Sequence, residues 1–132
     1  MARVLVDTSA VYAIIDRKDA NHSAAKAILD RLRGEGAEPL LTNFLLGECH
    51  ALLLTRLGSD VARRWLLTNV WRVERVTVDD EERATAILRE YVDKTFSYVD
   101  ATSFAVMERL RLRRAFAFDA HFEQFGLSVL RT

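Results

Sequence analysis

Four carboxylates lie where short apolar segments end or where the helices after them begin. Asp7 follows the apolar run VLV, and Asp119 follows AFAF. Glu48 lies within FLLGECHALLL, and Asp100 lies within SYVDATSFAVM. Chemistry in parallel α/β sheets usually takes place beyond the carboxyl ends of the strands. We therefore expect these four acids, although they come from separate segments, to converge at one edge of a sheet.

Carboxylate oxygens are ligands for hard divalent cations, so such a set is suited to Mg²⁺, with Mn²⁺ as a substitute. Without a cation, mutual repulsion would raise the pKa values of converging acids. Glu48 is the acid that most strongly indicates a metal. Its helical neighbours three and four residues away are all apolar, and a buried carboxylate needs a partner. A bound cation lowers the pKa of water and stabilises charge on phosphodiester oxygens. The set therefore predicts a metal-dependent phosphodiesterase.

Each of these residues also allows a purely structural interpretation. Asp7 and Asp119 can cap the helices that follow them, and Asp100 can complement a helix N-terminus. The hydroxyls of Thr8 and Ser97 can support the acids from outside, or they can cap helices themselves. Only the joint placement of the acids favours the metal site over capping.

The surrounding pattern predicts the elements that position the acids. Short strands are expected at residues 3–6, 40–42, 72–78, 115–118 and 127–130. Helices are expected at residues 8–15, 22–33, 44–57, 60–70, 79–92, 98–112 and 119–125. Short apolar strands that alternate with helices predict one α/β domain over residues 1–132, with a short parallel sheet of four to five strands covered by helices on both faces.

Composition narrows the compartment and the classes of site. No apolar run is long enough to cross a bilayer and no long signal-peptide core is present, so we expect a cytoplasmic protein without a membrane partner. Cys49 is alone, which rules out an internal disulfide and is typical of a reducing compartment. The scattered His22, His50 and His121 argue against a zinc site of the Cys/His type.

The net charge argues neither for nor against binding of nucleic acid, because 19 Lys and Arg balance 19 Asp and Glu. Only the local distribution of charge can indicate such a surface. The one dense basic run is RLRLRR at residues 109–114. If the run is helical, Arg109 and Arg113 share a face, and we expect these two to contact RNA phosphates. A role for the run as the basic end of a helix is the alternative.

Two helical segments, ALLLTRL and VARRWLL, carry much aliphatic surface. This surface can fill the core of the same chain, or it can serve as a contact for a second copy or for another protein. The residues alone leave both interpretations open.

Four longer segments together resemble the four acidic motifs of PIN-domain ribonucleases: VDTSAVYAIID, TNFLLGECHALLL, FSYVDATSFAVMERL and AFAFDAHFEQFG. The similarity is greatest to the VapC-type toxins of type II toxin–antitoxin pairs. It extends from about residue 3 to residue 128, with the motifs in the family's order and spacing. The joint pattern is specific, although D-T-S by itself would carry no information.

The resemblance implies a PIN-like fold and a Mg²⁺-dependent endonuclease that cuts tRNA, rRNA or mRNA. It implies that the metal is held by Asp7, Glu48, Asp100 and Asp119, with Thr8 and Ser97 as supporting hydroxyls. It further implies a homodimer and a cognate antitoxin. A stand-alone PIN-domain ribonuclease and a catalytically silent PIN-like RNA-binding module are the alternatives. A phosphotransferase of the haloacid-dehalogenase type is disfavoured, because the D-x-D that it needs after the first strand has Ser9 in its second position.

Overall fold

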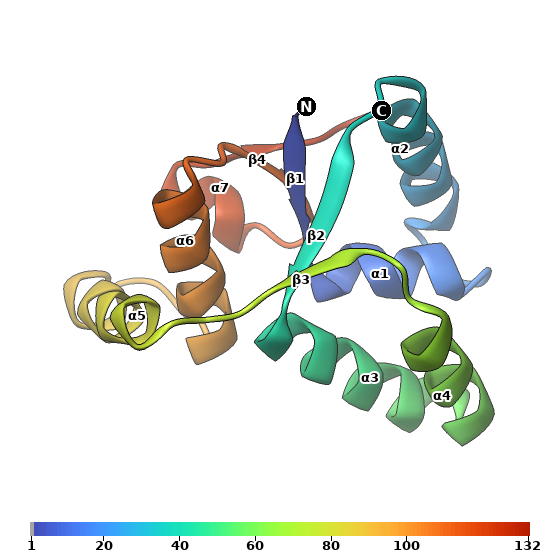
Figure 1. Cartoon of the computed structure of the whole chain (residues 1–132), viewed down its shortest axis with the longest axis horizontal. Coiled ribbons are helices and arrows are strands. Elements are labelled where there is room, and N and C mark those ends of the chain that lie inside the picture. The colour runs from blue at the N-terminus through green and yellow to red at the C-terminus, as the bar shows by residue number, and fades with distance from the viewer. Residues whose placement is uncertain (1) are drawn as a thin grey trace.

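In the computed structural model, which describes residues 2–132, five short strands form one parallel sheet in the order β3-β2-β1-β4-β5 (Figure 1). The strands are β1 (Arg3–Val6), β2 (Glu38–Thr42), β3 (Arg72–Glu74), β4 (Arg114–Phe116) and β5 (Ser128–Val129). β1 is central, since its Leu5 is in register with Leu40 of β2 and with Ala115 of β4. The chain adds β2 and β3 on one side of β1 and β4 and β5 on the other, so the strand order reverses beside β1.

Helices cover the sheet on both faces, as the sequence predicts (Figure 1). Within residues 2–132 they are α1 (Thr8–Ile15), α2 (His22–Gly34), α3 (Asn43–Leu57), α4 (Ser59–Thr68), α5 (Val78–Glu90), α6 (Tyr98–Leu110) and α7 (His121–Phe125). In Figure 1, α1, α2 and α4 lie on one side of the strands and α5, α6 and α7 on the other. Across the described chain, every helix is too short or too polar to span a membrane.

The core explains why β1 can occupy the middle of the sheet. Its residues 4–6 are fully buried, which is typical of a parallel strand covered on both faces. On the side of α6 and α7 the core is aromatic: the ring of Phe104 stacks on Phe125 at 4.5 Å between centroids and meets Phe122 edge-on at 5.1 Å. These rings hold α7 against α6 and thereby fix the loop that carries Asp119.

The elements have the expected order, but several boundaries differ from the prediction, among them those of β3 and α6. β3 is three residues long rather than seven, because α5 already begins at Val78. α6 ends at Leu110, where Arg111 adopts the left-handed conformation with φ 57° and donates its N–H to carbonyls of the last turn. Arg113 therefore lies beyond the helix, and the prediction that Arg109 and Arg113 share one helical face is wrong.

Arg109 joins α6 to the segment between β3 and α5. Its guanidinium donates to both carboxylate oxygens of Asp80 at 2.9–3.1 Å, to Glu74 at 3.1 Å and to the Arg75 carbonyl at 3.2 Å. Asp80 is only 3% exposed and also closes a capping box with Thr77. Burial alone would raise the pKa of Asp80, but the hydrogen bonds from Arg109 and Thr77 prevail and hold this pKa below its ordinary value.

Replacing Arg109 by Ala should destabilise the protein, because the buried Asp80 carboxylate loses its cationic partner. Since the guanidinium is partly exposed, we expect a loss of about 2–3 kcal/mol in the free energy of unfolding at pH 7. The lowered pKa of Asp80 adds stability above its unfolded-state pKa, and this stability is lost as the pH falls through the folded-state value. The difference from wild type should therefore shrink below about pH 4, as urea unfolding at pH 7 and pH 3 can measure.

The matched control is Arg113→Ala, which removes an exposed arginine from the same basic run. It should change the free energy of unfolding by less than about 0.5 kcal/mol. Equal losses for the two variants would contradict the structural role assigned to Arg109.

Candidate active site

The reversal of strand order beside β1 places the ends of β1 and β4 next to each other, and Asp7 and Asp119 follow these two strands. The backbone N–H of Asp7 still donates to the Phe116 carbonyl, at 2.9 Å. Ser9 connects the two segments: its Oγ donates to Asp7 Oδ2 at 2.6 Å and accepts from the Phe118 N–H at 2.9 Å. One hydroxyl thus fixes the Asp7 carboxylate to the loop after β4.

Asp7 is a buried carboxylate, 4% exposed, and it is also the N-cap of α1. Its Oδ2 accepts from the Ser9 backbone N–H at 3.1 Å in addition to the Ser9 hydroxyl. Burial raises the pKa of Asp7 to about 7, and the charges of Asp119 and Asp100 add to the rise, against the hydrogen bonds from Ser9. Capping and a place in the acidic set are therefore compatible roles for this residue.

Glu48 extends from α3 toward Asp7 and its neighbours at the start of α1. There, Thr8 Oγ1 of α1 donates a short hydrogen bond to Glu48 Oε1. Burial raises the pKa of Glu48, the Thr8 hydrogen bond opposes this, and the charges of Asp100 and Asp119 add to it. The neighbouring Cys49 is buried, and burial raises the pKa of its thiol to about 12. A thiol that stays protonated at neutral pH is unsuited to be a nucleophile or a metal ligand.

Asp100 stands in the first turn of α6, in a capping box with Ser97. The Ser97 N–H donates to Asp100 Oδ2 and the Asp100 N–H donates to Ser97 Oγ, each at 3.0 Å. His121 hydrogen-bonds Asp100 Oδ2 through Nδ1 at 2.7 Å, while its backbone N–H donates to Asp119 Oδ1 at 2.9 Å. Burial raises the pKa of Asp119, and the charge of Asp100 adds to the rise.

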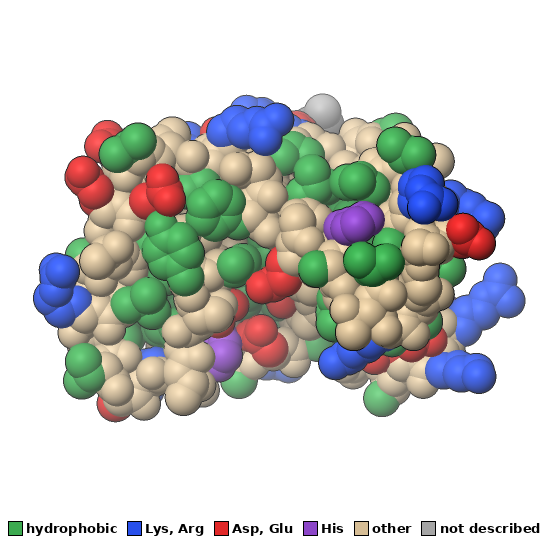
Figure 2. All heavy atoms as spheres, turned by 90° about the horizontal axis from the view of Figure 1, so that it is seen from below, with side chains coloured by type: hydrophobic (Ala, Val, Ile, Leu, Met, Phe, Trp, Pro, Cys, Tyr) green, Lys and Arg blue, Asp and Glu red, His purple; other side chains and the backbone are tan. Residues whose placement is uncertain are grey.

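These acids line one open cavity of about 420 Å³ at the carboxyl end of the sheet. All four predicted acids and both predicted hydroxyls are among its lining residues: Asp7, Glu48, Asp100, Asp119, Thr8 and Ser97. Figure 2 shows the molecule from this end, with acidic side chains near the middle of the face and Lys and Arg side chains mainly around its edge. The convergence expected from the strand ends is thus observed, and a cluster of carboxylates within a ring of cations can hold a divalent cation beneath a phosphate chain.

The comparison with known proteins identifies the family. The family model of the PIN domain matches residues 4–127. The chain belongs to the PIN-domain family. Together with the relatives and solved structures described next, this match confirms the resemblance to PIN-domain ribonucleases of the VapC type and shows a hydrolase of the nuclease class.

Relatives of this PIN domain extend over nearly the whole chain. It is 39% identical over 132 residues to the 23S rRNA-specific endonuclease VapC20 of Mycobacterium tuberculosis, covering 97% of this chain and 98% of that protein. It is 27% identical over 120 residues to the ribonuclease VapC26 of the same species, covering 88% and 86%.

Solved structures have the same fold. The crystal structure of M. tuberculosis VapC20, a Sarcin-Ricin loop cleaving toxin, superposes with a TM-score of 0.87 at 37% identity and covers 98% of this chain and 99% of that chain. A toxin–antitoxin complex from Klebsiella pneumoniae superposes with a TM-score of 0.69 at 18% identity, covering 96% of this chain and 95% of that chain, which shows the fold alone.

The donor set of this PIN domain fits a hard divalent cation. Carboxylate oxygens dominate it, and candidate ligand atoms of Asp100, Asp119 and His121 lie within 4.8 Å of one another. In the described part of the chain, neither Asp7 nor Glu48 forms an ion pair with Lys or Arg. Their charges therefore have no protein cation to balance them.

His121 lines the cavity although it is not predicted from the sequence to belong to the site, and the same holds for Arg56. His121 is isolated from the other histidines, so it gives no sign of a Cys/His site. Its position two residues after Asp119, at the start of a short helix, is the signal that could have indicated it. Nδ1 contacts Asp100, and Nε2 lies 3.3 Å from Thr95 Oγ1, so both ring nitrogens have protein partners.

The predicted RNA-binding arginines do not line this cavity. Arg109 follows Asp100 by nine residues on α6, which corresponds to about 13 Å along the helix axis, and its guanidinium is held by Asp80 and Glu74. Arg113 lines a different hollow, beyond the end of α6.

Arg56 is the arginine that does line the site. Its guanidinium carbon lies 5.0 Å from the centre of the Tyr12 ring, and no acidic partner is found for it within residues 2–132. Glu48, Leu52 and Arg56 all line the cavity at successive steps of four along α3. This spacing was readable from the sequence once Glu48 had been chosen.

Replacing Asp7 by Asn should stabilise the metal-free PIN domain at pH 8. Because the folded state raises the pKa of Asp7 from 3.8 to about 7, the free energy of unfolding falls as the pH rises through this interval, and the penalty is fully present above about pH 7. Asn carries no charge and can still accept from Ser9, so we expect a gain of about 1–3 kcal/mol at pH 8 and little gain at pH 4. Urea unfolding in EDTA measures both values.

Asp60→Asn, which changes an exposed acid on α4, is the control and should be neutral at both pH values. A loss of stability in Asp7→Asn that is the same at pH 4 and pH 8 would show that capping by Asp7 outweighs its charge.

Proposed function

We propose that this PIN domain is an endoribonuclease that depends on Mg²⁺, with Mn²⁺ as a substitute, and that Asp7, Glu48, Asp100 and Asp119 form its metal site. The observation that carries the proposal is the convergence of four carboxylates in one cavity, where neither Asp7 nor Glu48 forms an ion pair with Lys or Arg within residues 2–132. When bound, the cation supplies a Lewis acid that activates water and balances charge on the phosphodiester. Membership of a family with ribonucleases supports RNA as the substrate.

Asp7 and Asp100 are the best placed to be direct ligands. In both residues Oδ2 is occupied by hydrogen bonds from the protein, from Ser9 in one case and from Ser97 and His121 in the other. Each Oδ1 is left for a ligand. His121 acts here as a positioning residue, because its own Nδ1 holds the Asp100 carboxylate in place.

Glu48 is suited to proton transfer. Its Oε1 accepts from Thr8, and Oε2 makes no hydrogen bond within the described residues. Burial raises the pKa of Glu48 above its ordinary value, which favours a carboxylate that accepts and returns a proton. Thr8 therefore serves to orient Glu48.

Arg56 is the cation that we assign to the RNA backbone. An acidic centre needs nearby positive charge if it is to receive a phosphate chain. Stacking on Tyr12 orders the guanidinium at the wall of the cavity, and Tyr12 is itself held by a 2.6 Å hydrogen bond from its hydroxyl to Asp16. This contact replaces the one expected of Arg109 and Arg113.

Among tRNA, rRNA and mRNA, an rRNA stem-loop is the first substrate to test, because a relative is a 23S rRNA-specific endonuclease. The cavity is open, so a loop with unpaired nucleotides can reach its acids.

A cognate antitoxin and a homodimer belong to the same proposal. A structural neighbour is a toxin–antitoxin complex. Part of the apolar surface of α3 and α4 stays exposed to solvent. Ala62 is buried, but Leu54, Leu66 and Leu67 are exposed, Leu67 by 74%. A stand-alone ribonuclease, without an antitoxin, is the alternative.

Cleavage of a stem-loop RNA with the sequence of the 23S rRNA sarcin–ricin loop tests the reaction. Wild type should cut it with Mg²⁺ or Mn²⁺, and EDTA should abolish the cutting. Asp100→Asn and Glu48→Gln should each lower kcat/KM by about 100-fold or more, because even residues behind metal ligands are worth 10- to 100-fold. Asp79→Asn, which alters an exposed acid of α5, should leave kcat/KM unchanged.

Two results would count against the proposal. Cleavage that persists in EDTA or in Asp100→Asn would remove the assigned site. Tight RNA binding without cleavage in Mg²⁺, for all RNA classes, would favour the catalytically silent RNA-binding module.

A further inference from the structure

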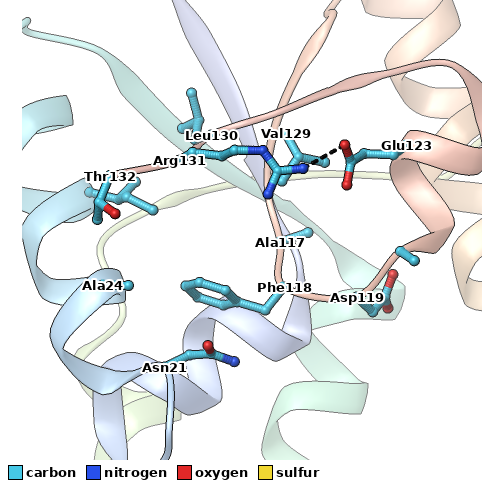
Figure 3. A pocket seen from close by; sticks show the side chains of 12 residues that line it. Asn21, Ala24, Ala117, Phe118, Asp119, Glu123, Val129, Leu130, Arg131 and Thr132 are labelled. Carbon is cyan, nitrogen blue, oxygen red and sulfur yellow. Dashed lines mark hydrogen bonds and ion pairs between the residues drawn. The ribbon is translucent and has the colours of Figure 1, made fainter.

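A second hollow, of about 460 Å³, lies between α2, the loop after β4, α7 and the chain after β5 (Figure 3). Its size falls within the range of small-molecule sites. Figure 3 shows the ring of Phe118 extending into the hollow toward Ala24, with Asn21 on one side and the side chain of Arg131 on the other. Phe118 is only partly buried there, although it follows a buried strand.

The hollow continues into the acidic cavity. Asn21, Phe118 and Asp119 line both spaces. Phe118 and Asp119 are adjacent in the chain, so their Cα atoms are about 3.8 Å apart. A ligand that is held at Asp119 can therefore place its next chemical group beside Phe118.

The lining is suited to a neutral, flat group and unsuited to a phosphate. Ala24, Ala117, Phe118 and Val129 are apolar. The charged side chains at the rim offer no surplus cation, because Arg131 is paired with Glu123 at 2.6 Å and Asp119 is a further acid. A phosphate would meet net negative charge here, whereas a nucleobase would find an aromatic face on which to stack.

Asn21 adds a polar group at the boundary of the two spaces. It occupies the N-cap position of α2, where an Asn normally caps, yet its side chain makes no capping hydrogen bond. Within residues 2–132 its only hydrogen bonds come from the backbone, whose N–H donates to Asp19 Oδ2 at 3.0 Å and whose carbonyl accepts from Ala25. Asn21 is exposed, so its amide donors and acceptor face solvent and are open to the edge of a base.

We propose that this hollow binds one unpaired base of the RNA, from a nucleotide next to the scissile phosphate, by stacking on Phe118 and hydrogen bonding to Asn21. The inference rests on the proposed ribonuclease function and makes Phe118 and Asn21 specificity-determining residues for it. The base is held on the side of Asp119, and the phosphate chain continues over the acidic cavity toward Arg56.

The test uses the sarcin–ricin stem-loop RNA, after the cut made by wild type has been mapped, and two copies with an abasic ribose on either side of that cut. Wild type should lose roughly 5- to 150-fold in kcat/KM on one of the two abasic RNAs, which is the range for loss of one stacked base. Phe118→Leu should show a loss of similar size on the intact RNA and little further loss on the abasic RNA, since the two changes remove the same contact.

Trp71→Leu is the matched control, because it replaces another partly buried aromatic residue that lines neither space. It should discriminate against the abasic RNA as wild type does. Asn21→Ala provides a second variant, in case Phe118→Leu folds poorly. It should cut the intact RNA several-fold less well and respond less to a change of base at the affected position.

A binding measurement separates this inference from the proposed function. With Glu48→Gln as the background and 2-aminopurine in place of the base, fluorescence should be quenched on binding, and Phe118→Leu should abolish the quenching. If wild type cuts no RNA in Mg²⁺, the proposed function fails, and quenching of 2-aminopurine placed at each unpaired loop position in turn still tests the hollow. If wild type cuts intact and abasic RNAs equally, the base site is overturned while the ribonuclease stands. The inference is also overturned if Phe118→Leu loses as much on the abasic RNA as on the intact RNA, as expected if Phe118 serves the fold or a protein partner.

Discussion

The burial of several carboxylates in one cavity is the constraint on which this site depends. Burial raises the pKa of Asp7, Glu48 and Asp119; the charge of Asp100 adds to all three rises, and the charge of Asp119 adds to those of Asp7 and Glu48. A domain that only had to fold would place such groups outside. Here the fold supplies neutral donors to the carboxylates, namely the hydroxyls of Ser9 and Thr8 and backbone N–H groups such as that of Ser97. Neutral donors satisfy the oxygens but leave the charge unbalanced, so a cation from solution is favoured.

The contrast with Asp80 shows that this imbalance is specific to the site. α5 and α6 both begin with a capping box in which the third helical residue is an aspartate, Asp80 in one and Asp100 in the other. Asp80 receives a guanidinium from Arg109 and has a lowered pKa. Asp100 instead lies beside the imidazole of His121 and one further acid, Asp119. The same local motif therefore holds an ion pair on one helix and contributes to the acidic cavity on the next.

Much of this arrangement could be predicted from the sequence because strands and acids leave strong local signals. The fully apolar VLV before Asp7 and AFAF before Asp119 indicated buried parallel strands, and the strand-end rule placed their acids together. Glu48 was identifiable because an acid without a nearby cation is unusual on an apolar helix face.

The failures came from contacts between distant segments. The partner of Arg109 is 29 residues away in the chain, so the sequence left Arg109 open as a contact for RNA. Arg111 takes a left-handed conformation that arginine rarely adopts, and nothing in RLRLRR marks the end of the helix there. His121 and Arg56 matter only through residues that folding brings to them, Asp100 and Tyr12.

The hydroxyl of Ser9 has a consequence for how this protein can vary. It holds the first carboxylate with its hydrogen and the amide of Phe118 with its lone pair, so a single atom spans the gap between β1 and β4. Ser9 thus links the loop that bears the Phe118 ring, beside the second hollow, to the Asp7 carboxylate, inside the first cavity. A change that shifts the loop after β4 moves the Phe118 ring and the Asp7 carboxylate together, so the distance between them is kept. Substitutions of the side chains that line the second hollow can change which base is preferred, while the distance from that hollow to the acidic cavity stays the same.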